Sequence, residues 1–252
     1  VTDRITCSPP LGAVGGWFGG PFVRGKLERM LRYRHAVLGA DLEMHARAAL
    51  SPLHIAVTGA SGLVGSALVP FLTTGGHRVT RLVRRSPAAG EVQWQPDAGR
   101  LDAAALEGID AVVHLGGENI ANGRWTTERK RLLRESRVGS TRLLAGALAR
   151  LERKPGVLVS VSGTGIYGSH GNEIQVDESP PGIGFLAEMA TAWEAAAAPA
   201  LDAGIRVAHP RFGIVLSPAG GALAKMLPAF LAGGGGPMGG GMIGQKANSF
   251  GP

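Results

Sequence analysis

The stretch His54-Ile-Ala-Val-Thr-Gly-Ala-Ser-Gly-Leu-Val-Gly-Ser-Ala-Leu68 indicates the fold of this chain. A short apolar run, carried by Ile55 and Val57, has the length and composition of a buried strand. Three glycines follow at intervals of three residues: Gly59, Gly62 and Gly65. Apolar residues at helical spacing come next: Leu63, Val64, Ala67, Leu68, Phe71 and Leu72. The pattern predicts a strand, a tight turn and a helix that buries this apolar face, with a kink at Pro70.

A glycine turn of this kind is typical of sites that bind the pyrophosphate of a dinucleotide. The first glycine lets the chain leave the strand tightly, the second lets backbone N–H groups approach the phosphate, and the third lets the helix pack on the strand. The N-terminus of the helix then faces the anion. The same spacing recurs at residues 233–239 without a strand or helix around it, so the flanking pattern carries the prediction. The expected contacts are Gly59, Ser61, Gly62, Leu63, Val64 and Gly65.

The length of 252 residues is enough for one sizeable core, or for one domain and part of another. The chain begins without an initiator methionine and ends after a glycine-rich run, which favours a piece of a longer protein. Its single cysteine, Cys7, cannot form a disulfide within the chain and suits a reducing compartment. No basic and apolar leader opens the sequence, and no run of about 18 apolar residues is present to span a bilayer. We therefore expect a cytoplasmic protein with no membrane span.

The formal charge of +7 raises the question of nucleic-acid binding. Basic residues cluster at 24–34 and 124–137, but both segments have amphipathic helical patterns on which arginines form a solvated face. Only seven Phe and two Tyr are available to stack on bases. The sequence therefore favours a small-molecule ligand over nucleic acid, and we expect no metal site.

The first 50 residues differ in pattern from the rest of the chain. A strand is expected at 1–7, a Gly/Pro-rich segment follows at 8–21, and a helix comes after it. The apolar residues of this helix are Leu27, Met30, Leu31, Val37, Leu38 and Leu42. One strand and one helix cannot bury a core. This segment therefore either packs on the main domain or is the end of a domain whose front is missing.

The end of the second expected strand, at 78–83, predicts the choice of cofactor. NAD sites place an Asp or Glu here for the ribose 2′-hydroxyl, whereas this chain has Arg84 and Arg85, with no acid before Glu91. Guanidinium groups match the geometry and charge of a 2′-phosphate. We therefore expect NADP, and the alternative is that the two arginines are merely exposed at a strand end.

Strands and helices alternate through the remainder of the chain. Strands are expected at 91–94, 109–115, 157–162 and 205–209, and helices at 126–150 and 185–198. Thr126 or Thr127 caps the first of these helices, and its expected inward residues are Leu132, Leu133, Leu143, Leu144 and Leu148. The fold class is α/β, a Rossmann-like doubly wound parallel sheet. Ligands bind beyond the carboxyl ends of such strands, so Leu115, Glu118 and Asn119 are candidate contacts.

Together these motifs resemble the extended short-chain dehydrogenase/reductase superfamily, and within it an atypical epimerase-like family with a TGASGLVG start. The resemblance spans roughly residues 54–245. It rests on the following elements: 58–65, 114–120 with Trp125, Ser136-Arg137, Thr141, 165–168, 178–180, Trp193-Glu194 and 211–216. The resemblance implies NADP binding, with Arg84, Arg85, Glu118 and Arg124 at cofactor-contacting positions. Residues 10–42 resemble the end of a START-like, polyketide-cyclase type domain.

One departure from the superfamily concerns the reaction itself. Enzymes of this superfamily use a Tyr and a Lys four residues later in the sequence. The phenol transfers a proton, and the ammonium lowers the pKa of the phenol. At that offset Tyr33 is followed by Val37 and Tyr167 by Gly171. The helix that should carry the pair has Phe185 and Met189 instead. The sequence therefore predicts an atypical mechanism.

Tyr167 and Ser162 are the candidate catalytic residues. Tyr167 is the only phenol near the expected crevice, but lining of the substrate pocket is favoured over catalysis, because Tyr167 lies on a loop after a strand and not on the helix that normally carries the acid. Ser162 is the hydroxyl that the superfamily would place beside the phenol, although Thr164 fits that place as well. His114, at the end of an apolar strand, is interpreted as a core histidine and not as a catalyst.

The expected domains are a partial START-like segment at 1–50, an NADP-binding Rossmann domain at 53–232, and a Gly-rich start of a truncated substrate domain at 233–252. The expected function is that of an oxidoreductase or epimerase acting on an unknown small molecule, nucleotide-sugar-like or another carbonyl or hydroxyl compound. Two alternatives stay open: a sensor or scaffold that binds NADP without turnover, and a lipid-handling protein that acts through the START-like part. The sequence does not indicate an oligomeric state.

Overall fold

A computed structural model describes residues 12–49, 51–120, 123–171 and 173–234. The chain divides after Ser51 into two units, which are treated separately. The strand expected at 1–7 lies outside the described residues, as do residues 235–252 of the Gly-rich segment. The START-like interpretation of the first unit stays a prediction.

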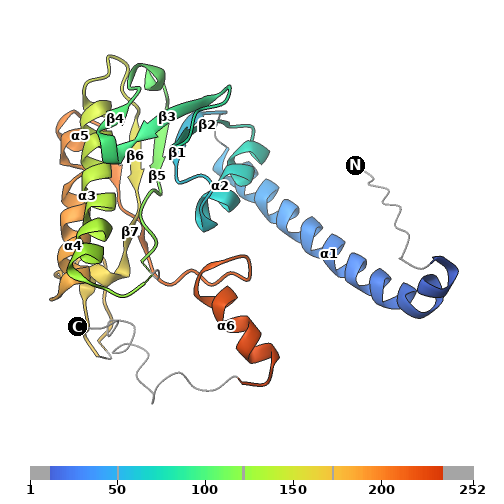
Figure 1. Ribbon diagram of the computed structural model, residues 1–252. Coiled ribbons are helices and arrows are strands. Elements are labelled where there is room, and N and C mark those ends of the chain that lie inside the picture. The colour runs from blue at the N-terminus through green and yellow to red at the C-terminus, as the bar shows by residue number, and fades with distance from the viewer. Residues whose placement is uncertain (1–11, 50, 121–122, 172, 235–252) are drawn as a thin grey trace. The chain divides into compact units, whose positions relative to one another are not determined.

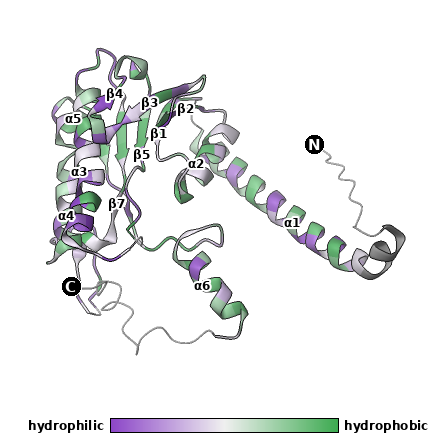
Figure 2. Ribbon diagram, in the orientation of Figure 1, coloured by the Kyte–Doolittle hydropathy of each residue, from purple (hydrophilic) through white to green (hydrophobic). Residues whose placement is uncertain are grey.

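The first unit contains one long helix, α1 (Gly12–Ala48). The helix begins well before the position expected from the sequence and runs through Pro21. A proline inside a helix removes one backbone hydrogen bond, but the remaining turns keep theirs once the helix is nucleated. Apolar side chains such as Met30 and Leu42 are about half exposed within this unit, and Figure 2 shows apolar and polar residues alternating along the helix. A single helix cannot bury its own apolar side chains.

The second unit contains the sheet. Its elements before the first long crossover helix are β1 (His54–Thr58), α2 (Leu63–Thr74), β2 (Arg78–Val83), β3 (Glu91–Gln95), η1 (Pro96–Ala98), β4 (Arg100–Leu101), η2 (Ala104–Leu106) and β5 (Ala111–His114). The elements that follow are α3 (Thr127–Ala149), β6 (Val157–Ser160), β7 (Ser162–Gly163), η3 (Thr164–Tyr167), α4 (Phe185–Ala195), α5 (Ala198–Asp202), β8 (Arg206–Ala208), β9 (Arg211–Phe212) and α6 (Gly221–Leu231).

Seven strands form the main sheet in the order β4-β3-β2-β1-β5-β6-β8. Every pair is parallel except β3 and β4, which are antiparallel at one edge. The order reverses at β1, because β2 lies on one side of it and β5 on the other. The prediction of a Rossmann-like, doubly wound parallel sheet is confirmed, and the short edge strand β4 was not foreseen.

Helices lie on both faces of this sheet (Figure 1). The larger core lies between the sheet and α3 and α5, and includes Leu82, Val112, Leu158, Leu144 and Leu148. The smaller core lies under α2, where Val69 packs with the β1 residues Ile55 and Val57. Figure 2 shows the central strand β5 as largely apolar, whereas β2 and β3 carry polar residues as well. Near-continuous apolar strands are expected where both faces are covered.

Two details of the predicted helix faces are corrected. In α2 the buried residues are Gly65 and Val69, four residues apart, whereas Ala67 is exposed. In α3, Leu133, Leu144 and Leu148 are buried as expected, but Leu132 is 40% exposed. A helix buries only the side chains that face the sheet, and Leu132 lies ahead of Leu133, the first buried residue of α3. The α2 helix is continuous through Pro70.

The carboxyl ends of three neighbouring strands place polar side chains side by side. Thr58 of β1 is paired in register with His114 of β5, and His114 with Ser160 of β6. A second, two-stranded sheet continues beyond this edge, where β7 pairs with β9. The candidate site is built from this edge and the loops that leave it. None of the helices in the described ranges is long and apolar enough to cross a membrane.

Candidate functional site

The glycine turn after β1 leaves no space for side chains at two of its three glycines. Gly59 has a φ of +67°, and a Cβ there would lie 2.9 Å from the Leu115 carbonyl carbon. A Cβ on Gly65 would lie 2.3 Å from the Gly59 carbonyl oxygen. Gly62 is the N-cap of α2 and offers no side chain to its first N–H groups. Those N–H groups point beyond the helix end, as an anion-binding turn requires.

Thr58 and His114 connect this turn to the loop that follows β5. The Thr58 hydroxyl oxygen accepts hydrogen bonds from the N–H groups of Leu115 and Gly116, both at 3.1 Å. A hydroxyl has one hydrogen, so Thr58 donates it to Nδ1 of His114 at 2.7 Å. The proton of His114 therefore lies on Nε2, 3.3 Å from the Ser140 hydroxyl.

His114 is held neutral by its surroundings. It is fully buried, and burial lowers the pKa of its imidazole to about 4. Its hydrogen-bond partners are hydroxyl groups, and Trp94 contacts its ring edge-to-face with the centroids 6.1 Å apart. The interpretation of His114 as a core histidine agrees with this geometry, since it orients the loop without facing a ligand.

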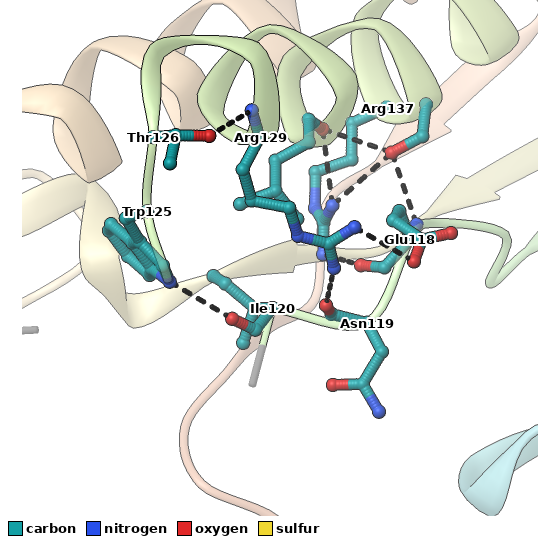
Figure 3. Close-up of polar contacts among 9 residues, drawn as sticks. Glu118, Asn119, Ile120, Trp125, Thr126, Arg129 and Arg137 are labelled. Carbon is teal, nitrogen blue, oxygen red and sulfur yellow. Dashed lines mark hydrogen bonds and ion pairs between the residues drawn. The ribbon is translucent and has the colours of Figure 1, made fainter. Parts of the chain in front are cut away.

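The loop after β5 is fastened to α3 by Arg129 and Arg137, of which the sequence analysis named only Arg137, as part of the family resemblance (Figure 3). Arg129 pairs with the Glu118 carboxylate at 3.1 Å and also donates to the Asn119 carbonyl. Arg137 donates to the Glu118 carbonyl oxygen at 2.9 Å. The Glu118 N–H donates to the Ser136 hydroxyl at 3.1 Å. The Glu118 carboxylate, expected to contact a cofactor, is therefore occupied by an ion pair within the chain.

Arg137 is a largely buried cation. Burial lowers the pKa of its guanidinium to about 10, and the opposing charge of Glu118 limits the shift. Its guanidinium also lies over the Trp193 ring, 5.3 Å from the ring centroid. The Trp193 indole N–H donates to the Thr141 hydroxyl at 2.9 Å, so α3, α4 and the loop are held together.

Arg124, the other candidate on this loop, is exposed. Its guanidinium has no hydrogen-bond or ion-pair partner among the residues that the structure describes. The neighbouring Trp125 indole N–H donates to the Ile120 carbonyl at 3.1 Å (Figure 3). The charge of Arg124 is therefore available to a ligand.

Arg84 and Arg85 both lie exposed just beyond β2, but they differ in their partners. Arg85 pairs with Glu91 at 2.7 Å and donates to the Ser86 carbonyl at 2.9 Å. The hydrogen bond from Arg85 is the main cause that holds the pKa of Glu91 below its usual range, and the Ala88 N–H adds to it. Arg84 has no such partner within the described part of the chain. The expectation that no carboxylate lies near these arginines is therefore wrong, because the 86–90 loop folds Glu91 back onto Arg85.

Tyr167, Glu194 and Arg211 form a cluster beyond the carboxyl end of β6. Arg211 of β9 donates to the Tyr167 phenol oxygen at 2.7 Å and holds the Glu194 carboxylate with two hydrogen bonds of 2.9 Å. It also donates to the Asp177 carbonyl at 2.9 Å. Burial raises the pKa of Glu194, but the hydrogen bonds and the positive charge of Arg211 outweigh it and hold the pKa below its usual range.

Ser162, the second catalytic candidate, is buried beside this cluster. Its oxygen has no hydrogen-bond partner within 3.5 Å in the described ranges. The alternative hydroxyl, Thr164, approaches only the Phe212 carbonyl, at 3.5 Å. The structure therefore brings Tyr167 and Ser162 to the same end of the sheet, each near Glu194 or its partner Arg211.

The positions of the missing Tyr/Lys pair are filled by packing residues. Phe185 begins α4 and contacts Trp125 edge-to-face, with the ring centroids 5.7 Å apart. The Lys130 ammonium lies 5.6 Å from the Phe185 ring centroid. Met189 is buried. Neither position carries a phenol or an ammonium, and the described residues contain no group of three metal-ligating side chains.

Residues 55–233 match the family described as the NAD dependent epimerase/dehydratase family. The chain belongs to this family. Among its relatives, an epimerase family protein of Mycobacterium bovis is 43% identical over 188 residues, 74% of this chain and 62% of the relative. The human epimerase family protein SDR39U1 is 37% identical over 193 residues, 75% of this chain and 64% of the relative. The chain thus spans less than two thirds of the length of these family members.

Solved structures of the family share the fold. A nucleoside-diphosphate sugar epimerase from Corynebacterium glutamicum superposes with a TM-score of 0.73 and 41% identity, covering 83% of this chain and 44% of that one. Human SDR39U1, solved with NADPH, superposes with a TM-score of 0.67 and 35% identity, covering 75% of this chain and 63% of that one. The resemblance to an epimerase-like short-chain dehydrogenase/reductase family is confirmed.

Proposed function

We propose that this family member binds NADP(H) and acts as an oxidoreductase or epimerase on a small molecule with a carbonyl or hydroxyl group. The observation that carries the proposal is the glycine turn, where Gly59 and Gly65 leave no space for a side chain. Such a turn brings backbone N–H groups and a helix N-terminus to a pyrophosphate. The turn lies at β1, where the strand order reverses and dinucleotides bind in sheets of this type.

The preference for NADP over NAD is supported by the charge beyond β2. Arg84 and Arg85 are both exposed there, and Glu91 neutralises only the second. A guanidinium can hold the doubly charged 2′-phosphate with two hydrogen bonds. The presence of NADPH in the human relative supports the same choice. The candidate contacts are those of the turn, Arg84, Arg85, Leu115 and Arg124, with Glu118 holding the loop after β5 in place through its bonds to α3.

The proposed substrate class is a nucleotide sugar or a similar carbonyl or hydroxyl compound. The relative from Corynebacterium glutamicum is named a nucleoside-diphosphate sugar epimerase, and this supports the class without fixing the substrate. The cofactor supplies or accepts the hydride in such reactions. The chain must then supply a group that transfers the proton.

Titration calorimetry with NADP⁺ and NAD⁺ tests the proposal. We expect NADP⁺ to bind more tightly by at least about tenfold, or roughly 1.4 kcal/mol. Failure to bind either nucleotide would remove the proposed function. Equal affinities for the two nucleotides would still support nucleotide binding, but they would mean that Arg84 and Arg85 are exposed surface residues with no role in the choice of cofactor.

A second candidate is a protein that binds NADP without turnover. The filling of the usual catalytic positions by Phe185 and Met189 favours it. Nucleotide binding together with a lack of hydride transfer to any carbonyl compound would support this alternative.

A further inference from the structure

The Tyr167 phenol has a cationic partner that comes from a distant part of the chain. Tyr167 ends η3, the short helix that follows β6 and β7, and Arg211 lies 44 residues later on β9. The Arg211 guanidinium donates to the phenol oxygen at 2.7 Å, and its central carbon lies 5.3 Å from the ring centroid. The pairing of β7 with β9 sets this distance, because Ser162 and Arg211 are register partners.

Arg211 is itself held from several sides. Glu194 of α4 binds it through both carboxylate oxygens, and the Asp177 carbonyl accepts a further hydrogen bond. Its side chain is 22% exposed and that of Glu194 is 16% exposed. The guanidinium therefore has little rotational freedom, and the phenol that it binds is fixed beyond the carboxyl end of β6.

The hydrogen of the phenol is not used by this cluster. Arg211 can only donate, so Tyr167 accepts from it and keeps its own hydrogen. Among the residues that the structure describes, Arg211 is the sole hydrogen-bond partner of the phenol oxygen. Tyr167 is only 8% exposed, so its phenol proton can be transferred only to a ligand that lies directly against it at the carboxyl end of the sheet.

We propose that Tyr167 is the catalytic residue that transfers the proton and that Arg211 is its positioning residue, so that this pair takes the place of the missing Tyr/Lys pair. The inference rests on the proposed function. In the reducing direction the carbonyl carbon of the substrate would accept the hydride that bound NADPH would supply, and the electron pair of the broken π bond would move to the carbonyl oxygen. That oxygen takes the proton of Tyr167. The phenolate left behind keeps the hydrogen bond from Arg211 and regains a proton from solvent.

The charges around the Tyr167 phenol determine how strongly Arg211 can stabilise the phenolate. Glu194 balances the charge of Arg211, and His209 is the other titratable group near its carboxylate. The other acid on α4, Glu188, is exposed. The local stabilisation of a phenolate therefore comes from the short, directed hydrogen bond of Arg211 and less from net charge.

The test counts the protons released when nucleotide binds to the whole chain. Oxidised NADP⁺ carries a positive nicotinamide ring that reduced NADPH lacks, and a phenol beside that ring would lose its proton more readily. Calorimetry at about pH 8 in two buffers of different ionisation enthalpy measures this release. We expect NADP⁺ to release more protons than NADPH, and Tyr167→Phe to abolish the difference while its NADP⁺ affinity at about pH 6 stays within about threefold.

Two controls separate the outcomes. Tyr33→Phe removes the other tyrosine of the chain and should leave the proton release unchanged. The double change Arg211→Gln and Glu194→Gln removes the ion pair without leaving a lone buried charge, and should move the release to higher pH with the fold intact by circular dichroism. An equal proton release for Tyr167→Phe and the unmodified chain, or equal release for the two nucleotides, would overturn the proposal. A lack of binding heat for both nucleotides would instead remove the proposed function.

Discussion

The hydroxyl oxygen of Thr58 and Nδ1 of His114 lie 2.7 Å apart at the carboxyl ends of adjacent parallel strands. The same oxygen accepts the N–H groups of Leu115 and Gly116, so one side chain satisfies three groups of the neighbouring strand and its loop. That loop is also the segment against which Gly59 packs without space for a Cβ. The position of the loop relative to the glycine turn is therefore set by one buried threonine and one neutral histidine.

Replacement of Thr58 by Val should lower the stability of the chain. Valine has the same shape but leaves His114 Nδ1 and the Gly116 N–H without a partner, and each buried unsatisfied group costs about 1–3 kcal/mol. We expect the free energy of unfolding to fall by about 2–3 kcal/mol in urea denaturation. Thr58→Ser keeps the hydroxyl and serves as the matched control, with a much smaller loss. Equal losses for the two variants would contradict the network.

The buried His114 should make stability depend on pH. Its pKa is about 4 in the folded chain against 6.5 for the free side chain, so the unfolded state binds a proton that the folded state does not. The free energy of unfolding that depends on neutral His114 is fully present above about pH 6.5. It falls by roughly 3 kcal/mol in total as the pH falls toward 4. Denaturation between pH 4 and 7 should show a slope that is shallower in His114→Gln. A slope unchanged by this substitution would show that other groups cause it.

Gly65→Ala should damage both folding and nucleotide binding. Its Cβ would lie 2.3 Å from one backbone atom and 2.7 Å from another, so the turn must shift. We expect a loss of about 1–3 kcal/mol in stability and a fall of more than about tenfold in NADP⁺ affinity. Gly139→Ala is the matched control, because Gly139 lies inside α3 with open space around it and should gain up to about 1 kcal/mol. A Gly65→Ala variant that binds NADP⁺ normally would exclude the turn as the phosphate site.

The sequence predicts features that depend on neighbours along the chain, and it misses those that depend on tertiary contacts. The strand, turn and helix at residues 54–74 follow from local periodicity. The cap expected at Thr126 or Thr127 is Thr126, whose side chain accepts a hydrogen bond from the Arg129 N–H three residues later. The Tyr167–Arg211 contact joins residues 44 positions apart through the pairing of β7 with β9. The Arg85–Glu91 pair was missed for another reason, since the loop between them reverses direction and brings an acid back to the strand end.

The partly buried ion pair of Glu194 and Arg211 should contribute to stability, whereas an exposed pair on α3 should not. Glu194→Gln weakens the bidentate contact and leaves the Arg211 charge without its counterion. We expect the free energy of unfolding to fall by roughly 1–2 kcal/mol. This is less than for a fully buried pair, because both side chains are partly exposed to solvent. Glu135→Gln is the control, because Glu135 pairs with Arg131 where both side chains are more than half exposed. Urea denaturation should show no measurable change for Glu135→Gln, and equal effects would contradict the distinction.

The last prediction concerns the arginines beyond β2 and the acid that faces them. Arg84→Ala with Arg85→Ala should abolish the preference for NADP⁺ while leaving NAD⁺ affinity nearly unaltered, because both side chains act on the 2′-phosphate alone. The preference should weaken as salt rises, since both groups are exposed.

Glu91 opposes the binding of NADP⁺, because its carboxylate holds Arg85 at 2.7 Å and repels a phosphate. Glu91→Gln should therefore increase the preference for NADP⁺ by about threefold to tenfold, since the amide frees Arg85 and removes the repulsion while its oxygen can still accept the Ala88 N–H. Glu128→Gln, at an exposed pair on α3, is the control for a general change in charge. Calorimetry with both nucleotides at two salt concentrations measures all of these effects, and a lower NADP⁺ affinity in Glu91→Gln would mean that Glu91 positions Arg85 for the phosphate instead of competing with it.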